Sequence, residues 1–396
     1  MSRIENWMLP DGVEEILPEE ARHIEDLRRR LLNLFNRWGF DLVIPPMMEF
    51  SDALMVGLGQ DLEGLTYKVV DQVSGGTMAI RSDMTPQAAR MDAHSLKREG
   101  VNRLCYSGHV LFTRAKSPLC SRSPLQVGVE LFGESALDAD LEIISLLIEA
   151  VQSAALPQWS LDLGHVGIFR ALAEACALSP EQERQLFELV QAKAMTDIHA
   201  WVGRTIQDPR QAAWFLELPR LSGGISVLEK AKNLFNDAPV AVLTAINELQ
   251  QIAEQLRQRY PDVPVYLDLS ELRGYHYHTG IVFAAFAPGL GREIASGGRY
   301  DHIGEAFGRA RPATGFTLDL ISLKRLGEAS NLPVTGIFVA YELACAHWAT
   351  VQTLREQGER VVCATASFPH YLPYLACDRQ LQMVDGTLAI SPLINV

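Results

Sequence analysis

The periodicity of apolar residues along the sequence changes twice, and these changes limit what the chain can fold into. From about residue 170 to 260 helical periodicity dominates, in runs such as "SPEQERQLFELVQAKAM" and "NELQQIAEQLRQRY". Breaks in this region fall at Pro209, Pro219, Gly223, Gly224 and Pro239. We therefore expect a mostly helical insertion, within a chain whose 396 residues are enough for roughly two or three domains.

The residues before the insertion predict helices and strands in alternation. Residues 19–38 repeat apolar side chains at three- and four-residue spacing, which is typical of an amphipathic helix. The stretch "FDLVIPPMMEF" predicts a short strand that Pro45 and Pro46 end. The stretch "TYKVVDQVSGGTMAIRSD" predicts a hairpin that turns at its Gly-Gly pair. Residues 137–153 predict a second helix.

Sequence patterns typical of β-strands return after the insertion. They begin in "VPVYLDLSELRGYHYHTGIVFAAF", and "REIASGGRYDHI" predicts a neighbouring strand and turn. A last unit follows, with strand "TGIFVAY", a helix near residues 344–356 and strand "RVVCAT". This order and spacing predict a parallel βαβ unit. With only about 60 residues, the unit is small for an independent domain.

The composition argues against several classes of protein. The net charge of −13 argues against a nucleic-acid-binding surface, because phosphate binding relies on clustered Lys and Arg. The 6 cysteines form no C-x-x-C pair, which favours reduced thiols over a disulfide framework or a zinc site. The first residues include acidic side chains and no apolar run of signal-peptide length, and no window has the roughly 18 apolar residues of a membrane span. We therefore expect a cytoplasmic protein with no membrane contact.

Polar clusters in four stretches lie outside any amphipathic pattern. They are "IRSDMTPQAAR", "SPLQVGVELFG", "ELRGYHYHTGIVF" and "ASGGRYD". In the second, Gln126, Gly128 and Glu130 share one strand face, and Gly128 leaves space for a small polar ligand between the amide and the carboxylate. For each cluster alone, the simpler interpretation is a solvated sheet face or a turn, such as a glycine turn with an Arg–Asp pair in "SGGRYD".

Together, the clusters offer the groups that a free amino acid needs. Asp83 and Glu130 are carboxylates for an ammonium group, and Arg273 can pair bidentately with a carboxylate. Rings for a planar polar side chain come from Tyr277, His278 and Tyr300. We therefore predict a pocket for a free amino acid, and an imidazole side chain would suit it.

Metal and cofactor signals are weak. His276 and His278 would share a face if their stretch were a strand, which leaves a metal site open, but the sequence offers no clear third ligand. The chain contains no P-loop, no G-x-S-x-G and no H-E-x-x-H motif. We expect neither a metal ion nor a cofactor.

Several blocks resemble, in the same order, the blocks of the histidyl-tRNA synthetase catalytic core. They are "GFDLVIPPMMEF", "IRSDMTPQAAR", "LRGYHYHTGIVF", "SGGRYDHIGEAFG" and "TGFTLDLISL". The resemblance covers most of residues 5–325 and is weak in the insertion. It implies an α+β fold of the class II aminoacyl-tRNA synthetase type, with an antiparallel sheet flanked by helices. Its members dimerise through the first helix and the strand that ends here at Pro45 and Pro46.

The resemblance also implies a division into domains. A histidine-binding core spans residues 1–325 and carries the helical insertion at about 170–260. A small α/β unit over residues 326–396 is similar to a truncated remnant of the anticodon-binding domain.

Carried over position by position, the resemblance implies a histidine pocket and no catalytic residue. Asp83 stands where the synthetases carry glutamate, and His278 stands where they usually carry tyrosine. The implied histidine-binding residues are Asp83, Thr85, Gln126, Glu130, Arg273, Tyr277, His278 and Tyr300.

Two arginines that the synthetases use to hold ATP phosphates are replaced. Phe112 occupies the position of the arginine in the second block of the family, and Ser322 occupies the position of the arginine in the third block. Preorganised cations supply much of the transition-state stabilisation in phosphoryl chemistry, so these replacements argue against adenylation. Arg114 would compensate in part if the alignment shifts by two residues, whereas Lys324 and Arg325 fall on other faces of a helix.

One group of relatives has these properties: the regulatory subunits of the short-form ATP phosphoribosyltransferase, the first enzyme of histidine biosynthesis. The resemblance implies a non-catalytic subunit that forms a hetero-octamer with the short catalytic subunit, activates it and mediates feedback inhibition by L-histidine. The truncated anticodon unit and the acidic charge argue against tRNA as a partner.

Three alternatives stay open at the level of sequence. A divergent active histidyl-tRNA synthetase and a synthetase-like ligase for another acceptor both need the missing arginines. A kinase-regulating synthetase-like domain would need a kinase block, which the sequence does not contain.

Overall fold

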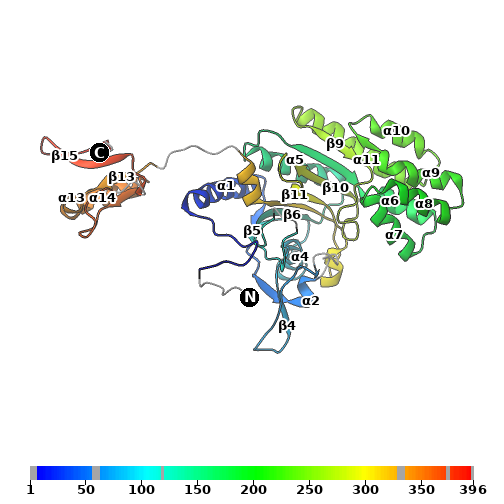
Figure 1. Cartoon of the computed structure of the whole chain (residues 1–396), viewed down its shortest axis with the longest axis horizontal. Coiled ribbons are helices and arrows are strands. Elements are labelled where there is room, and N and C mark those ends of the chain that lie inside the picture. The colour runs from blue at the N-terminus through cyan, green and yellow to red at the C-terminus, as the bar shows by residue number, and fades with distance from the viewer. Residues whose placement is uncertain (1–6, 56–62, 117–119, 328–334, 372–374, 394–396) are drawn as a thin grey trace. The chain divides into compact units, whose positions relative to one another are not determined.

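The computed structural model describes residues 7–55, 63–116, 120–327, 335–371 and 375–393. The chain divides into two compact units, Met1–Glu328 and Ala329–Val396, both of which are drawn in Figure 1.

A nine-stranded sheet forms the centre of the larger unit. Its strands are β1 (Asp41–Leu42), β5 (Asn102–His109), β6 (Leu125–Phe132), β7 (Ser160–His165), β8 (Ser222–Gly223), β9 (Val265–Asp268), β10 (Ile281–Phe286), β11 (Glu293–Arg299) and β12 (Ala313–Asp319). They lie in the order β1-β5-β6-β12-β11-β10-β7-β9-β8. Only the pairs β1–β5 and β7–β9 are parallel, and the other described pairs are antiparallel. This sheet confirms the predicted α+β class.

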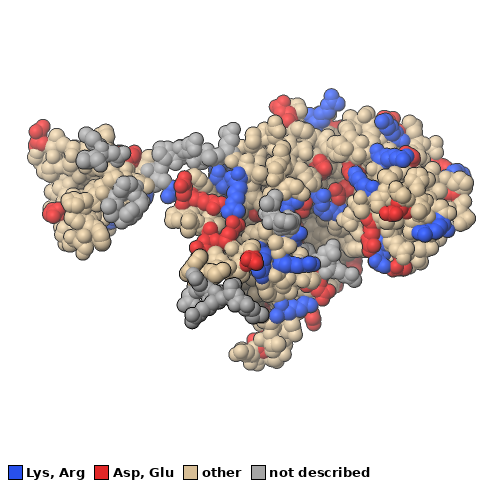
Figure 2. Space-filling view, in the orientation of Figure 1, with Lys and Arg blue, Asp and Glu red and all other residues tan. Residues whose placement is uncertain are grey.

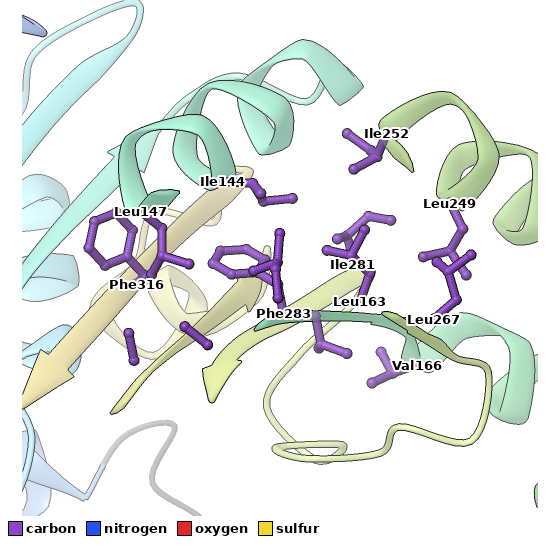
Figure 3. Close-up of a cluster of buried hydrophobic side chains, with 14 of the residues drawn as sticks. Ile144, Leu147, Leu163, Val166, Leu249, Ile252, Leu267, Ile281, Phe283 and Phe316 are labelled. Carbon is purple, nitrogen blue, oxygen red and sulfur yellow. The ribbon is translucent and has the colours of Figure 1, made fainter. Parts of the chain in front are cut away.

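Two long helices cover one side of the sheet's central strands. They are α1 (Pro18–Arg37) and α5 (Leu137–Gln152), which confirm the predicted helices to within one residue at each end. A short helix, α12 (Leu320–Leu326), follows β12 and contacts α1. Figure 3 shows Ile144 and Leu147 of α5 above Phe316 and Phe283 of the sheet, and all four side chains are buried. Burying aromatic and branched side chains in this way is the main favourable term in folding.

The segment predicted as an insertion is helical. It holds α6 (Val166–Ala175), α7 (Pro180–Gln191), α8 (Met195–Thr205), α9 (Pro209–Glu217), α10 (Val227–Leu234) and α11 (Val240–Arg259), with a 3₁₀ turn at Leu218–Arg220. Helix α11 contacts α5, α6 and β7, and its Leu249 and Ile252 point toward Leu163 and Ile281 of the sheet (Figure 3). Because β8 also pairs with β9, this helical region shares one core with the sheet.

The predicted hairpin is confirmed in a small three-stranded sheet. Its strands are β2 (Met48–Phe50), β3 (Lys68–Val70) and β4 (Thr77–Ile80), in the order β2-β4-β3. Gly75 takes a φ of +73° at the turn, a conformation that side chains disfavour. Helices α2 (Ser51–Leu54) and α4 (Thr85–Arg90) border this sheet, and α4 continues into a π-helical turn at Met91–Leu96.

The short strand predicted before Pro45 and Pro46 is confirmed as β1. The two prolines separate it from β2, which was not predicted. Their carbonyl groups accept hydrogen bonds from side chains, Pro45 from Arg81 at 2.9 Å and Pro46 from Gln87 at 2.7 Å. Side chains therefore satisfy the backbone here in place of a neighbouring strand.

The strand pattern predicted for residues 263–286 is wrong over residues 269–280. Strands β9 and β10 are separated by turns over residues 269–280, where Gly274 has a φ of +65°. Alternating rings in "GYHYH" resemble the period of a strand, but Gly274 allows a reversal that no other residue type adopts easily.

The smaller unit contains a four-stranded sheet in the order β14-β13-β15-β16. Its elements are β13 (Ile337–Val339), α13 (Tyr341–Ala346), α14 (Trp348–Glu356), β14 (Val361–Cys363), β15 (Arg379–Val384) and β16 (Thr387–Pro392). The parallel pairing of β13 with β14 confirms the predicted βαβ unit. The hairpin of β15 and β16, which turns at Asp385 and Gly386, was not predicted.

Within the described residues, no helix combines the length and apolarity needed to cross a bilayer. On the face seen in Figure 2, Lys and Arg side chains are scattered among Asp and Glu side chains and form no single basic patch. All 6 cysteines are free thiols.

Candidate functional site

The predicted site residues meet in one pocket of about 260 Å³ in the larger unit. They come from the start of α4, from β6, from the segment between β9 and β10, and from the end of β11. The pocket is lined by every predicted residue: Asp83, Thr85, Gln126, Glu130, Arg273, Tyr277, His278 and Tyr300. Its volume lies just below the roughly 300–1,000 Å³ of drug-sized ligand sites, so it fits a small metabolite.

Glu130 is the most buried carboxyl group of the pocket, with 1% of its surface exposed. Three hydroxyl groups donate to it: Thr85 and Tyr106 to Oε1, each at 2.8 Å, and Tyr300 to Oε2. Gly315 pairs with it across the sheet, and a Cβ at Gly315 would lie 1.8 Å from Glu130 Oε2. Burial raises the pKa of Glu130 to about 8, although the three hydroxyl donors oppose this rise.

Asp83 is the second carboxylate of this end of the pocket. Its Oδ1 accepts the backbone N–H of Met84 at 2.7 Å and of Thr85 at 3.3 Å. Burial raises the pKa of Asp83, against the effect of these N–H groups and of the Lys116 ammonium. Burial disfavours the anionic form of both carboxyl groups, and an ammonium group beside them would offset this cost.

Two buried polar atoms of the pocket lack a partner. Among the described residues, Gln126 Oε1 and the Tyr277 hydroxyl have no hydrogen bond of normal length. The Tyr277 ring stacks on Tyr300, with centroids 4.9 Å apart and planes at 18°. Since buried polar atoms are rarely left unpaired, these two atoms are available to hydrogen-bond a polar ligand group.

His278 is held as a neutral ring. Its Nδ1 lies 3.2 Å from the Arg299 carbonyl, and because a carbonyl only accepts, Nδ1 carries the proton. Burial lowers the pKa of His278 to about 4, so Nε2 remains an acceptor at neutral pH. Gly274 and Gly298 confine the ring, since a Cβ on either would lie within 3 Å of it.

Arg273 lines the same pocket and already has acidic neighbours. Its guanidinium is 3.4 Å from Glu271 and 4.0 Å from Glu293, and it lies 5.2 Å from the centroid of the Phe286 ring. The side chain is 37% exposed, so these contacts leave donors available for a ligand carboxylate.

Sequence reasoning missed several charged residues of the pocket. They are Lys116, Asp162, Glu271 and Glu293. Burial raises the pKa of Asp162 to about 6, and the neighbouring Glu271 adds to this rise. Glu271 directly precedes "LRG", and Glu293 begins the strand that leads to "SGGRY", so their closeness to these motifs could have predicted them. Nothing in the sequence distinguishes Lys116 or Asp162.

The predicted role of Gly128 is wrong. A Cβ at Gly128 would lie 2.7 Å from the Tyr106 ring and 2.6 Å from the Phe316 carbonyl, and Gly128 does not line the pocket. The space above this glycine is filled by Tyr106, the residue opposite it on β5. Gly128 thus admits the ring that donates to Glu130, and this ring fills the space that was predicted for a ligand.

Several arginines of the polar clusters are structural, as the simpler interpretation expected. Arg90 pairs with Glu49 at 2.7 Å, and Arg299 pairs with Asp140 at 2.7 Å and Asp301 at 3.4 Å. These side chains fix the elements that carry Thr85 and Tyr300 and are absent from the pocket lining.

The two histidines do not share a face, because their segment is not a strand. His276 is exposed and packs on Phe187, whereas His278 lines the pocket. No group of three or more His, Cys, Asp or Glu residues suited to a metal ion occurs in the described part of the chain.

Of the two positions of the missing ATP arginines, Phe112 borders a smaller cavity of about 100 Å³, and Ser322 contacts Asp319 of its lining. Phe112 is buried there, and the Lys116 ammonium lies 4.5 Å from its ring centroid. The Ser322 hydroxyl donates to Asp319 at 2.6 Å, and Arg292 donates to both, at 2.9 Å and 2.7 Å. Arg292 is therefore a cation that the sequence did not place near the third block, and it is neutralised by Asp319.

Comparisons with known proteins agree with this geometry. The family model of histidyl-tRNA synthetase matches residues 12–323, and the model of the ATP phosphoribosyltransferase subunit HisZ C-terminal domain matches residues 334–390. The ATP phosphoribosyltransferase regulatory subunit of Saccharophagus degradans is 55% identical over 393 residues, which cover 99% of this chain and 100% of the relative. That of Pseudomonas aeruginosa is 49% identical over 398 residues, with 100% of both chains covered.

Solved structures give the same result. A crystal structure of an ATP phosphoribosyltransferase regulatory subunit/histidyl-tRNA synthetase from Bacillus halodurans has a TM-score of 0.84 at 27% identity and covers 96% of this chain and 99% of its own. A histidyl-tRNA synthetase from Nostoc has a TM-score of 0.79 at 19% identity, over 98% of this chain and 97% of its own, which shows a shared fold. The chain therefore belongs to the family of ATP phosphoribosyltransferase regulatory subunits, which have the fold of histidyl-tRNA synthetase.

Proposed function

We propose that the pocket binds free L-histidine and that its occupancy regulates the catalytic partner of this chain. The ammonium group would lie between Asp83 and Glu130, and the carboxylate would pair with Arg273. The imidazole would lie beside the stacked rings of Tyr277 and Tyr300. The observation that carries the proposal is the convergence of these groups, from four separate parts of the chain, on one pocket with two unpartnered polar atoms.

The charge state of the pocket supports an amino-acid ligand. Empty, the buried Glu130 is largely protonated near neutral pH, because its pKa is about 8. An ammonium group beside it favours the carboxylate, so binding would convert a desolvated neutral acid into an ion pair with hydroxyl donors already in place. The site is thus preorganised for a cationic amine.

The chain is the regulatory, non-catalytic subunit of ATP phosphoribosyltransferase in histidine biosynthesis. We further propose that it works in the cytoplasm, that its partner is the short-form catalytic subunit, and that the two form a hetero-octamer. In this assembly the chain would activate the catalytic subunit, and bound histidine would favour the less active state. Such a coupling between sites is typically worth about 1–3 kcal/mol.

Two details of the assembly follow from the synthetase fold and are also proposals. The chain would dimerise through α1 and the segment from β1 to Pro45 and Pro46. We propose no tRNA partner, because the smaller unit resembles a truncated remnant of the anticodon-binding domain and the chain is acidic.

Isothermal titration of the full chain tests the ligand assignment. L-Histidine should bind with one site per chain, whereas histamine, which lacks the carboxylate, and imidazole propionate, which lacks the ammonium, should each bind at least about tenfold more weakly, since each loses a charged hydrogen bond. Equal affinity for all three would show that neither Arg273 nor the pair of Asp83 and Glu130 binds the ligand. No heat with histidine would overturn the assignment itself.

A further inference from the structure

The segment between β9 and β10, residues 269–280, has two faces and is called the pocket loop here. Toward the pocket it presents Glu271, Arg273, Gly274, Tyr277 and His278. The side chains between these residues, Tyr275 and His276, instead contact α6 and α7 of the helical region. One short loop therefore forms part of the ligand pocket and part of the interface with the helices.

Tyr275 anchors the loop in the helical region. It is only 3% exposed, and its ring packs edge-on against Phe169 of α6 at 5.3 Å and stacks on Phe187 of α7 at 5.2 Å. Its hydroxyl donates to Glu183 of α7. Burial raises the pKa of Tyr275, so it remains a protonated donor at any physiological pH. The anchor combines aromatic packing with one charged hydrogen bond.

Arg170 of α6 holds the backbone of the same loop. Its Nη2 donates to the carbonyl of Tyr275 at 3.1 Å and to the carbonyl of His278 at 3.0 Å. The guanidinium also lies 5.1 Å from the centroid of the Tyr275 ring. A single side chain thus fixes both ends of the four residues that include Tyr277 and His278, although it does not itself line the pocket.

We propose that Arg170 and Glu183 are positioning residues for the ligand pocket, through which α6 and α7 hold the pocket loop in its binding conformation and respond to ligand binding. The inference rests on the proposed binding of histidine. If the helices favour the binding conformation of the loop, a bound ligand must stabilise the contacts of the loop with the helices by the same free energy, because coupling between two sites is reciprocal. The helical region is then the element that detects an occupied pocket.

The first test compares two substitutions with the same chemical change in the full chain. Arg170→Met removes both hydrogen bonds to the pocket loop and keeps an unbranched side chain. Arg184→Met is the matched control, since Arg184 lies on α7, pairs only with Glu181 and Glu188 in the described contacts, and is 51% exposed. Titration with L-histidine should show an affinity at least about fivefold weaker for Arg170→Met, the low end of typical coupling, and an unchanged affinity for Arg184→Met. Wild-type affinity in a folded Arg170→Met chain would overturn the inference.

The second test separates positioning from simple structural support. Amide hydrogen exchange in α6 and α7 should slow when the wild-type chain is saturated with histidine, because ligand binding stabilises the contacts of these helices with the pocket loop. In saturated Arg170→Met, protection should persist in β6 and β12 and be lost in α6 and α7. Identical exchange of the two helices with and without histidine in the wild-type chain would overturn the inference. A purely structural Arg170 would lower the thermal midpoint without changing affinity or ligand-induced protection.

A milder substitution covers the case in which Arg170→Met fails to fold. Tyr275→Phe removes only the hydroxyl that donates to Glu183, and it should weaken histidine binding in the same direction by about twofold or more, within the range of one hydrogen bond. Unchanged affinity of the folded Tyr275→Phe chain, with histidine bound normally by the wild-type chain, would exclude the inference and leave the proposed function intact. A wild-type chain that binds no histidine would instead overturn the proposed function, and the inference with it.

Discussion

At the scale of single residues, the pocket is organised by Glu130. Its carboxyl group receives hydroxyl donors from three elements, and Gly315 leaves the room that one of its oxygens needs. Arg273 is the complementary group, although Glu271 and Glu293 already share its charge. Lys116 is a second cation in the lining, but burial lowers its pKa, which leaves Arg273 as the stronger partner for a ligand carboxylate.

Arg273→Ala should reduce histidine affinity below detection in a normal titration while the chain remains folded. The substitution removes the only arginine of the described pocket lining and leaves Glu271 and Glu293 without their shared cation, so carboxylate binding becomes repulsive. Circular dichroism and the thermal midpoint check the fold. Arg292→Ala, next to the smaller cavity, is the control that should retain binding, and retained binding in Arg273→Ala would mean that Lys116 holds the carboxylate.

Glu130→Gln should weaken histidine binding by about 1.5–3 kcal/mol, the usual worth of a hydrogen bond to a charged group. The amide keeps the shape of the side chain but cannot take the negative charge that an ammonium group favours. Titration of both chains at pH 8 measures the difference. An unchanged affinity would place the ammonium group beside Asp83 alone.

The affinity for histidine should rise as the pH rises from about 6 to 8. The sign follows from proton release: the empty Glu130 holds a proton below its pKa of about 8, whereas the ion pair with an ammonium group favours the carboxylate. Titrations in buffers of different ionisation enthalpy should show a proton released at pH 7. Because the imidazole of histidine also titrates near pH 6.5, Glu130→Gln is the necessary control, and it should show less release. Equal release from both chains would contradict this assignment.

At the scale of elements, glycines on the strands β6 and β12 leave the space that the side chains around Glu130 occupy. Gly128 on β6 makes room for the Tyr106 ring of β5, and Gly315 on β12 makes room for the Glu130 carboxyl group. Gly128 faces Tyr106 across β5 and β6, and the ring lies against the glycine backbone so that its hydroxyl reaches Glu130. The absence of a side chain at Gly128 therefore allows Tyr106 to pack in this place. Gly128 affects the pocket only through this packing.

Gly128→Ala should destabilise the fold by about 1–3 kcal/mol, the usual cost of overpacking a buried site. The added Cβ would meet the Phe316 carbonyl at 2.6 Å, and a backbone carbonyl cannot rotate away. Chemical denaturation measures the free energy of unfolding. Gly203→Ala in α8 is the matched control, because a Cβ there has open space and alanine favours a helix, so this change should be neutral or stabilising. Equal stability of both variants would contradict the packing seen around Gly128.

At the scale of the whole molecule, the sequence predicted the parts of the fold that local patterns encode. Periodicity and turn residues predict the helices α1 and α5, the hairpin of β3 and β4 and the βαβ unit. The resemblance to histidyl-tRNA synthetase predicts the residues that line the pocket. What it could not predict depends on distant contacts. Lys116 and Asp162 enter the pocket from segments with no distinctive pattern, and Tyr106 fills the space over Gly128 because of strand register.

We propose that this pocket carries the histidine response of ATP phosphoribosyltransferase. A reconstitution tests this directly by following phosphoribosyl-ATP formation by the short catalytic subunit of the same organism, alone, with this chain, and with this chain plus histidine. The chain should raise the rate, histidine should lower it again, and the inhibition by histidine should be lost when the chain carries Arg273→Ala. A rate that does not respond to the chain, or an inhibition that Arg273→Ala leaves unchanged, would overturn the proposal.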